Sequence, residues 1–550
     1  MRLIERRIGL LFGGFLLCFL VIVGRAFWLQ GVQGSSLASE AVSQQTETVT
    51  VPGLRGDLLD RRGNKLAASE DAATVYATPY QVKNPPAASA RLAPILEQPR
   101  GEVLEALTAD SGFSYVAHKV DLGTAARVEA LGIEGIGELP DSRRTYPQGD
   151  MAGQVIGAVG SENQGLTGLE EGEEAVLGGT DGERRIVKDA LGEPIRMETV
   201  TEAEDGEDIQ LTLDPVIQQK TEEVLNGVGE TYSPTGATAI VVDPRSSQVL
   251  AMANWPPADP ADLSEVSNDD LMNKATGFNY EPGSTFKAFT VAAALEEKLV
   301  TPATEFTLPP SIQVADRTIE DAEERGTETL SVGRILAQSS NVGAVTIGLE
   351  VGAEKFSRWI ERFGFGRRTG IQYPDEEIGI VPSLDQYSGS TMGNLPMGQG
   401  LAVTPMQMVA GYTAIADGGM LKRPQLIKRV GEEEISEPKG RRVISPEVAS
   451  EIREMLEGVL APGGTASEVS VPGYTLAGKT GTAQVAEDGG YSETKYIASF
   501  IGFAPAQNPQ LLAAVIVNEP QGEIYGGSVA APAFGQIAEF ALPYLGVPQE

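Results

Sequence analysis

The first apolar block of the chain lies at its N-terminus. Residues 8–24 are almost continuously apolar; three arginines within residues 1–7 precede them, and Arg25 and Trp28 follow. The run is at the short end of the roughly 17–25 residues that span a bilayer. Arg25 can extend its charge to the interface, and Trp28 suits the outer interface. The arginines put the N-terminus in the cytoplasm, so the pattern predicts a single-pass anchor at residues 8–29, with the rest outside the cytoplasmic membrane.

A cleaved signal peptide is the alternative to this anchor. Its hydrophobic region would be unusually long, and the small residues at 35–41 lie far from the end of that region. Leu16 and Leu17 precede Cys18, where a lipoprotein cleavage site requires a small residue. These features favour the uncleaved anchor.

Buried strands are predicted at both ends of the region after residue 208. Four runs have the apolar, β-branched composition of buried strands, and they cover residues 237–242, 249–253, 496–504 and 511–517. Asp214 and Pro215 supply an N-cap and a first helical residue for a helix at 214–225, and residues 530–545 form a terminal helix. Strands at both ends with helices between them suggest one α/β domain whose sheet joins distant segments.

Residues 30 to about 200 show a different pattern. Short strand-like runs, such as residues 45–51 and 74–77, alternate with Gly and Pro. The acidic run at residues 202–208 is rich in turn formers. It indicates either a linker between the two regions or a solvated hairpin loop.

Composition narrows the classes of function. The 550 residues are enough for two or three domains, and a formal net charge of −34 disfavours nucleic acid and indicates a solvated acidic exterior. Cys18 is the only cysteine, so neither a disulfide within the chain nor a Cys/His zinc cluster can form. No carboxylate spacing resembles a metal site, and we expect neither a metal nor a cofactor.

Three short motifs follow one another along the second half of the chain. They are Ser284-Thr-Phe-Lys287, Ser339-Ser-Asn341 and Lys479-Thr-Gly-Thr482. Together they describe a serine nucleophile that a lysine activates. The only histidine, His118, lies far upstream, so a Ser-His-Asp triad would need a residue from another region.

The first motif has the local context of a nucleophile. A Pro-Gly pair before Ser284 predicts a helix start, where backbone N–H groups stabilise charge that develops on an attacked carbonyl. Lys287 is expected on the same helix face, and a desolvated lysine beside a second cation has a lowered pKa and can act as a base. Taken alone, a capping serine and a surface lysine explain this motif better.

The second motif offers groups that move protons and bind amides. Ser339 can relay a proton between the amine and a leaving group. Asn341 provides both a donor and an acceptor for a substrate amide. Taken alone, this motif is better explained by turn or helix-cap chemistry.

The third motif lies in a strand predicted at residues 474–484. Gly481 lets another backbone approach, as when an extended peptide adds to a sheet edge, while Lys479 and the hydroxyls of Thr480 and Thr482 can hold a carboxylate. The N–H groups of Thr482 and the first-motif serine can form an oxyanion hole. A phosphate-binding loop is the alternative, but its preceding glycine spacing is absent.

The conjunction of the three motifs is typical of penicillin-binding proteins and class A β-lactamases. Five further blocks extend the match, at residues 55–63, 144–147, 165–170, 397–400 and 525–527. On these residues the chain resembles class B penicillin-binding proteins, the monofunctional DD-transpeptidases of peptidoglycan synthesis.

The resemblance implies an α+β, multidomain architecture in the bacterial cell membrane. A cytoplasmic tail (1–7), the anchor (8–29), a mixed α/β pedestal of the dimerisation type (30–207) and a transpeptidase domain (208–550) are expected in this order. The last resembles serine β-lactamases, an antiparallel sheet flanked by helices. Because no glycosyltransferase domain is seen, the expected partners are a polytopic membrane glycosyltransferase and division proteins.

The resemblance also implies a role for each motif residue. Ser284 would be acylated by the penultimate D-alanine of a peptidoglycan stem pentapeptide, with Lys287 as the base, and Ser339 and Asn341 would shuttle protons and position the acyl-enzyme. β-Lactams mimic the D-Ala-D-Ala end and would acylate the same serine. The residues expected to bind the terminal carboxylate are Lys479, Thr480, Gly481 and Thr482.

Three other functions stay open at this point. Similarity in the blocks at 397–405, 501–505 and 525–534 favours a division (septal) type, and the elongation type is its alternative. A serine β-lactamase shares the three motifs but needs neither the anchor nor the long pedestal. A non-catalytic β-lactam sensor would need a cytoplasmic signalling part, for which only residues 1–7 are available, and a scaffold would be expected to lose the serine or a lysine.

Overall fold

Two compact units make up the computed structural model. It describes residues 2–33, 35–36, 46–188, 194–264, 266–487 and 490–550. The first unit comprises Met1–Leu54, Glu70–Arg143 and Gly179–Gly206; the second comprises Arg55–Ser69, Arg144–Gly178 and Glu207–Glu550. Two segments that precede residue 207 in the sequence therefore pack within the second unit.

The N-terminal apolar run forms the long helix α1 (Arg2–Phe27), which a short π-helical turn, η1 (Trp28–Val32), extends. Residues 4–32 are long and apolar enough to cross a membrane. Their apolar side chains, including Phe15 and Leu17, are exposed, as expected for a helix whose surroundings are lipid. The expected fold class, with an N-terminal transmembrane helix, is confirmed in this element.

The rest of the first unit is mixed α and β. Strands β1 (Thr46–Val51), β6 (Gly182–Lys188) and β7 (Pro194–Thr201) form an antiparallel sheet; residue 45 of the predicted strand at 45–51 lies outside the described residues. A second group comprises β3 (Lys65–Ala77), η2 (Pro79–Gln81), α3 (Pro85–Leu96), α4 (Arg100–Leu107), β4 (Ser114–Asp121), α5 (Leu122–Glu129) and β5 (Ile136–Thr145). The first five residues of β3 and the last two of β5 belong to the second unit. Its core contains Val75, Leu92 and Leu107.

A five-stranded antiparallel sheet is the centre of the second unit. Its strand order is β10-β9-β21-β20-β19, so the first pair of predicted strands adjoins the last. The bounds are β9 (Gly236–Asp243), β10 (Gln248–Trp255), β19 (Ala477–Glu487), β20 (Gly490–Ala504) and β21 (Leu511–Asn518). Almost every residue of β9 and β21 is buried, because helices cover both faces of the sheet.

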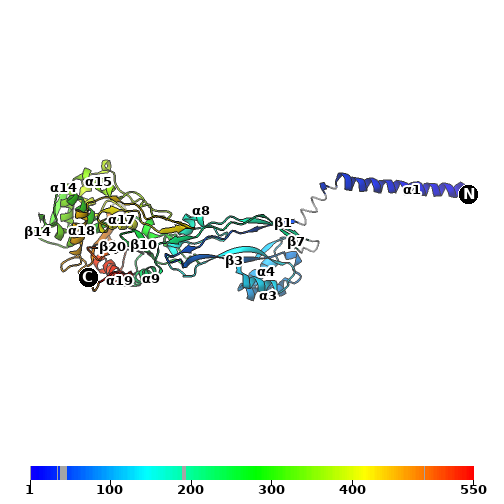
Figure 1. Ribbon diagram of the computed structural model, residues 1–550, viewed down its shortest axis with the longest axis horizontal. Coiled ribbons are helices and arrows are strands. Elements are labelled where there is room, and N and C mark those ends of the chain that lie inside the picture. Colours follow the sequence, from blue (N-terminus) through cyan, green and yellow to red (C-terminus); the bar gives the residue numbers. More distant parts are fainter. Residues whose placement is uncertain (1, 34, 37–45, 189–193, 265, 488–489) are drawn as a thin grey trace. The chain divides into compact units, whose positions relative to one another are not determined.

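Helices α9 (Pro215–Tyr232) and α19 (Gly526–Tyr544) lie along one face of the sheet, and α17 (Pro405–Ala416) lies on the other (Figure 1). Asp214 caps α9 as predicted, accepting hydrogen bonds from Val216 N and Ile217 N. This antiparallel sheet between helices confirms the fold expected of a transpeptidase domain.

The elements that carry the first two motifs lie between β10 and α17 in the chain. In chain order they include η3 (Gly283–Phe286), α12 (Lys287–Glu296), β11 (Glu305–Leu308), β12 (Ser311–Val314), β13 (Arg317–Glu320), β14 (Glu328–Ser331), α13 (Val332–Ala337), α14 (Asn341–Val351), α15 (Ala353–Arg362), α16 (Thr391–Asn394) and η5 (Leu395–Met397). The remaining elements of the unit are β2 (Leu58–Leu59), α6 (Gly153–Ile156), α7 (Gly168–Gly172), α8 (Glu174–Leu177), β8 (Ile209–Leu211), α10 (Asn268–Leu271), α11 (Lys274–Gly277), η4 (Leu384–Gln386), β15 (Met420–Leu421), β16 (Ile427–Val430), β17 (Glu433–Glu434), β18 (Arg441–Arg442) and α18 (Pro446–Glu457).

A buried ion-pair cluster joins two separate segments of the second unit, 55–69 and 144–178. The Glu170 carboxylate on α7 accepts from Arg55 Nε at 2.5 Å and from Arg144 Nε at 2.7 Å. Arg144 also donates to the Gly56 carbonyl at 2.8 Å, and the side chains of all three charged residues are at most 3% exposed. Removing the carboxylate would leave the buried Arg144 without its counter-charge and would leave Arg55 only its pair with the half-exposed Glu174 at 2.7 Å.

We expect Glu170→Ala to lower the free energy of unfolding by about 3–5 kcal/mol, the usual cost of breaking a buried ion pair. The measurement is denaturant unfolding of the detergent-solubilised chain, followed by tryptophan fluorescence. The neighbouring Glu171 is exposed, so Glu171→Ala is the control and should change stability by less than about 0.5 kcal/mol. Equal stability of the two variants would contradict a structural role for the cluster.

Candidate active site

Ser284 lies in η3, directly before helix α12, and not in the helix itself. The turn exists because two backbones meet closely: Gly283 N donates to the Gly398 carbonyl at 2.9 Å. Both glycines have positive φ, and a Cβ at Gly398 would lie 2.0 Å from Gly283 O. This contact explains why glycine is required directly before Ser284, at Gly283, and in the later block at 397–400, at Gly398.

Lys287 begins α12, and its amine is buried beneath the second motif. The side chain is 1% exposed, and Nζ donates to Ser339 O at 2.5 Å, Asn341 Oδ1 at 2.7 Å and Ser339 Oγ at 3.2 Å. Burial lowers the pKa of Lys287 to about 7, although the Asp321 carboxylate acts in the opposite direction. Near pH 7, the Lys287 amine is therefore neutral in a large fraction of the molecules.

The backbone of Ser339 is held in the left-handed region at φ 62°. A serine rarely adopts this conformation, and such residues persist only where the surrounding structure enforces them, often at functional sites. Here Ser339 follows α13 and precedes α14, and its carbonyl accepts the hydrogen bond from Lys287. The first and second motifs are thus joined through one amine.

The third motif lies on β19, the last strand of the five-stranded sheet. Among the described residues β19 pairs with β20 alone, so its other edge is free of a partner strand. Gly481 gives the room that the predicted close approach requires, because a Cβ there would lie 2.3 Å from Ser499 Oγ and 3.0 Å from Thr285 Cγ2. Thr482 Oγ1 accepts from Gly526 N at 3.0 Å and keeps its own proton for another acceptor.

Lys479 and Thr480 are both buried. Lys479 Nζ donates to Thr480 O at 3.1 Å, and the Thr480 hydroxyl contacts that of Thr465 at 2.6 Å. Burial, together with the positive charge of Lys287, lowers the pKa of Lys479 well below its ordinary value. A second amine therefore lies close enough to Lys287 for the charges of the two groups to interact.

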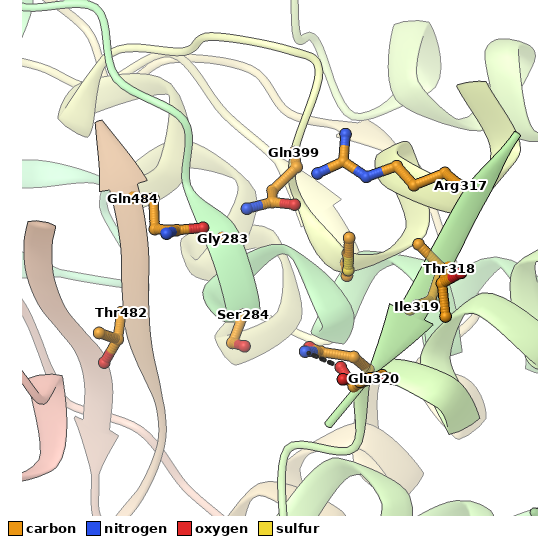
Figure 2. Close-up of a pocket in the computed structure, with 11 residues that line it drawn as sticks. Gly283, Ser284, Arg317, Thr318, Ile319, Glu320, Gln399, Thr482 and Gln484 are labelled. Atoms are coloured by element: carbon orange, nitrogen blue, oxygen red, sulfur yellow. Dashed lines mark hydrogen bonds between the residues drawn. The ribbon is translucent and has the colours of Figure 1, made fainter. Parts of the chain in front are cut away.

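A pocket of about 200 Å³ opens in front of Ser284. Figure 2 shows Thr482 and Gln484 on one side of the serine and β13 on the other, with Gln399 between the two sides. Asn341 also lines this pocket, whereas Lys287, Ser339, Lys479 and Thr480 lie outside its lining. The structure thus brings the motifs together, with three of their side chains open to a ligand and the two amines buried.

The arrangement can carry out acyl transfer by a serine. It combines a hydroxyl at a pocket, a buried amine near neutrality, and a free strand edge that can pair with an extended peptide. In the part of the chain that is described, no group of three or more His, Cys, Asp or Glu side chains is arranged to hold a metal ion.

Comparison with known proteins agrees with this geometry. Residues 237–539 match the penicillin-binding protein transpeptidase domain, and residues 50–211 match the penicillin-binding protein dimerisation domain. The chain belongs to the class B penicillin-binding proteins. Its expected family is confirmed, and that family consists of peptidoglycan DD-transpeptidases.

Individual relatives support the same assignment over nearly the whole chain. Stage V sporulation protein D of Bacillus subtilis is 36% identical, covering 98% of this chain and 85% of that protein. The peptidoglycan D,D-transpeptidase FtsI of Escherichia coli is 31% identical, covering 97% and 91%. The crystal structure of penicillin-binding protein 3 from Mycobacterium tuberculosis in complex with aztreonam has a TM-score of 0.71 at 30% identity, covering 91% and 98%.

Asp321, which follows β13, contributes to the site although no motif contains it. It accepts from Asn341 N at 2.5 Å, Val342 N at 2.9 Å and Ser340 Oγ at 2.9 Å, and it pairs with Arg325. Burial alone would raise the pKa of Asp321, but these hydrogen bonds and the arginine outweigh it and lower the pKa. Asp321 therefore fixes the start of α14 and places a negative charge near Lys287.

Gly481→Ala should destabilise the second unit by about 1–3 kcal/mol, because the added methyl overpacks a filled site. Denaturant unfolding measures this loss. Gly227 in α9 is exposed and has open space at its Cβ position, so Gly227→Ala is the control and should be neutral or stabilising by up to about 1 kcal/mol. A Gly481→Ala variant as stable as the control would show that the contact at Ser499 is loose.

Proposed function

We propose that this protein cross-links peptidoglycan stem peptides through an acyl-enzyme on Ser284. One observation carries the proposal: the buried amine of Lys287, with a pKa of about 7, is bound to Ser339 and Asn341 at the edge of the pocket that Ser284 lines. A base with a pKa near the working pH transfers protons most effectively.

The reaction has two half-steps. The Ser284 hydroxyl adds to the penultimate D-alanine carbonyl, and its proton passes to the neutral Lys287 amine. The peptide bond then breaks, and terminal D-alanine leaves as its amine takes that proton through the Ser339 hydroxyl, which lies 3.2 Å from Lys287 Nζ. An amine of a neighbouring stem attacks the ester, gives its proton to Lys287, and the Ser284 hydroxyl is restored.

The third motif receives the donor peptide. The Thr482 hydroxyl has a free proton for the terminal carboxylate, and Thr480 acts beside it through Thr465. Lys479 is buried beside Thr480, to whose carbonyl its amine donates at 3.1 Å, and its charge interacts with that of Lys287. The N–H groups of Thr482 and Ser284 form the oxyanion hole, and Gly481 leaves the strand edge open to the peptide backbone.

The anchor and the division of the chain follow from the same proposal. The apolar helix at residues 8–29 crosses the bacterial membrane once, with residues 1–7 in the cytoplasm, the pedestal at 30–207 and the transpeptidase domain at 208–550 outside. A polytopic membrane glycosyltransferase supplies the glycan strands. The motif blocks at 397–405 and 525–534 favour a role in division.

Ser284→Ala should abolish covalent labelling by benzylpenicillin, because the labelled atom is the serine oxygen. Intact-mass spectrometry of the wild type should show one added penicillin, and peptide mapping should place it on Ser284. The complexes of the Mycobacterium tuberculosis relative with ampicillin and with aztreonam make β-lactams suitable probes. Ser388, an exposed serine of the same unit, supplies the control Ser388→Ala, which should label like the wild type.

The pH dependence of acylation tests Lys287 as the base. The amine accepts a proton only when neutral, so the acylation rate should rise with pH through about 7 and level off above it. The Asp321 carboxylate raises the pKa of Lys287, so Asp321→Asn should move the midpoint to lower pH. Asp316→Asn removes an exposed charge nearby and should leave the midpoint in place. A flat profile between pH 5.5 and 8.5 would argue against the assignment of the base.

A further inference from the structure

Arg317 lies at the start of β13, opposite the third motif. The pocket lining contains two charged side chains, Arg317 and Glu320. Figure 2 shows the Arg317 guanidinium extending toward Gln399, on the other side of Ser284 from Thr482. The one cation that lines the pocket is therefore separated from the residues proposed to bind the C-terminal carboxylate.

No carboxylate in the described part of the chain forms an ion pair with this guanidinium, although acidic residues outnumber basic ones by 76 to 42. Arg325, only a few residues further along, shows the contrast, because it pairs with both Asp321 and Glu328. The charge of Arg317 acts on the Glu281 carboxylate only at longer range, so a half-buried arginine without an ion pair in such an acidic protein has capacity for an anion from outside.

The side chain is nevertheless held in place. The Arg317 guanidinium carbon lies 5.2 Å from the centroid of the Tyr491 ring, within the range of a cation–π contact. The Tyr491 hydroxyl bonds to Glu281 Oε1 at 3.2 Å, and the same oxygen accepts from Gly400 N at 3.0 Å. The ring orients the guanidinium without neutralising it, so little conformational freedom is lost when a ligand binds.

We infer that Arg317 is a specificity residue that binds a second, internal carboxylate of the acyl-donor peptide. The inference rests on the proposed function, because it requires that peptide to be the substrate. The planar guanidinium fork matches a carboxylate in two parallel hydrogen bonds. The chemical class recognised is a peptide with two carboxylates, one at its C-terminus and one on a side chain.

Strand geometry explains how one peptide reaches both ends of the pocket. Thr482 and Gln484 are two residues apart on β19 and both line the pocket, so an extended peptide added to this edge runs past them. Alternate side chains of an extended chain point to opposite sides. The side chains of the bound peptide that point away from β19 and across the pocket approach β13, where Arg317 lies.

The test compares matched peptides that end in D-Ala-D-Ala and differ only in one internal glutamate or glutamine. The variable residue is placed third, fourth or fifth from the C-terminus. Each peptide competes with acylation of the full-length chain by a fluorescent penicillin. For the wild type, the glutamate form should compete at about ten- to a hundredfold lower concentration at one of these positions, as expected of a charge-assisted contact.

Substitutions at Arg317 should change this preference in a graded way. Arg317→Gln should make the two peptides nearly equal, Arg317→Lys should keep part of the preference, and Arg317→Glu should reverse it. Arg368 is exposed and outside the pocket lining, so Arg368→Gln alters the net charge equally and should keep the full preference. Should Arg317→Glu fail to fold, the Gln and Lys variants still decide the outcome.

Two results separate this inference from the proposed function. If the wild type is acylated by penicillin but glutamate and glutamine peptides compete equally at every position, the inference is overturned and the acyl-transfer proposal stands. The inference is likewise overturned if Arg317→Gln retains the full preference. If the wild type takes up no penicillin, the proposed function itself fails.

Discussion

The geometry of the candidate active site depends on keeping one amine out of water. Lys287 is almost completely buried, and its amine binds the carbonyl and hydroxyl of Ser339 and the amide oxygen of Asn341. These partners accept hydrogen bonds but bring no full negative charge, so they hold the amine without strongly favouring its ammonium form. Asp321 is the nearby carboxylate that acts on it, and its charge is largely engaged by backbone N–H groups and Arg325.

The burial of this amine requires several backbones to approach closely. Gly398 meets the turn that carries Ser284, and Gly481 lets β19 lie against Ser499 and Thr285. The left-handed backbone of Ser339 directs its carbonyl to the amine. Glycine and strained residues thus occur where the site is assembled, and the regular helices and sheet around them supply the packing that holds such conformations.

The sequence could predict the motif residues of the candidate site and the elements of the central sheet. Repeated apolar runs are visible in the chain itself, as are the three motifs, and the strands near 237–242 and 511–517 formed as expected. The start of β20 was missed, because residues 490–496 are polar and extend the strand only through pairing with β19. Asp321, Arg317 and Tyr491 were missed because their significance depends on contacts between distant segments.

The division of the second unit between distant stretches of sequence limits where the chain can be cut. Segments 55–69 and 144–178 belong to this unit, and strand β2 within the first of them pairs in parallel with β8. A soluble fragment that starts at residue 208 would expose one side of β8 and would lack all three members of the Arg55–Glu170–Arg144 cluster. The second unit therefore cannot be transferred to another protein as one contiguous segment. During synthesis, its first segments must also wait for the residues of the first unit that lie between them and the last segment before the unit can fold completely.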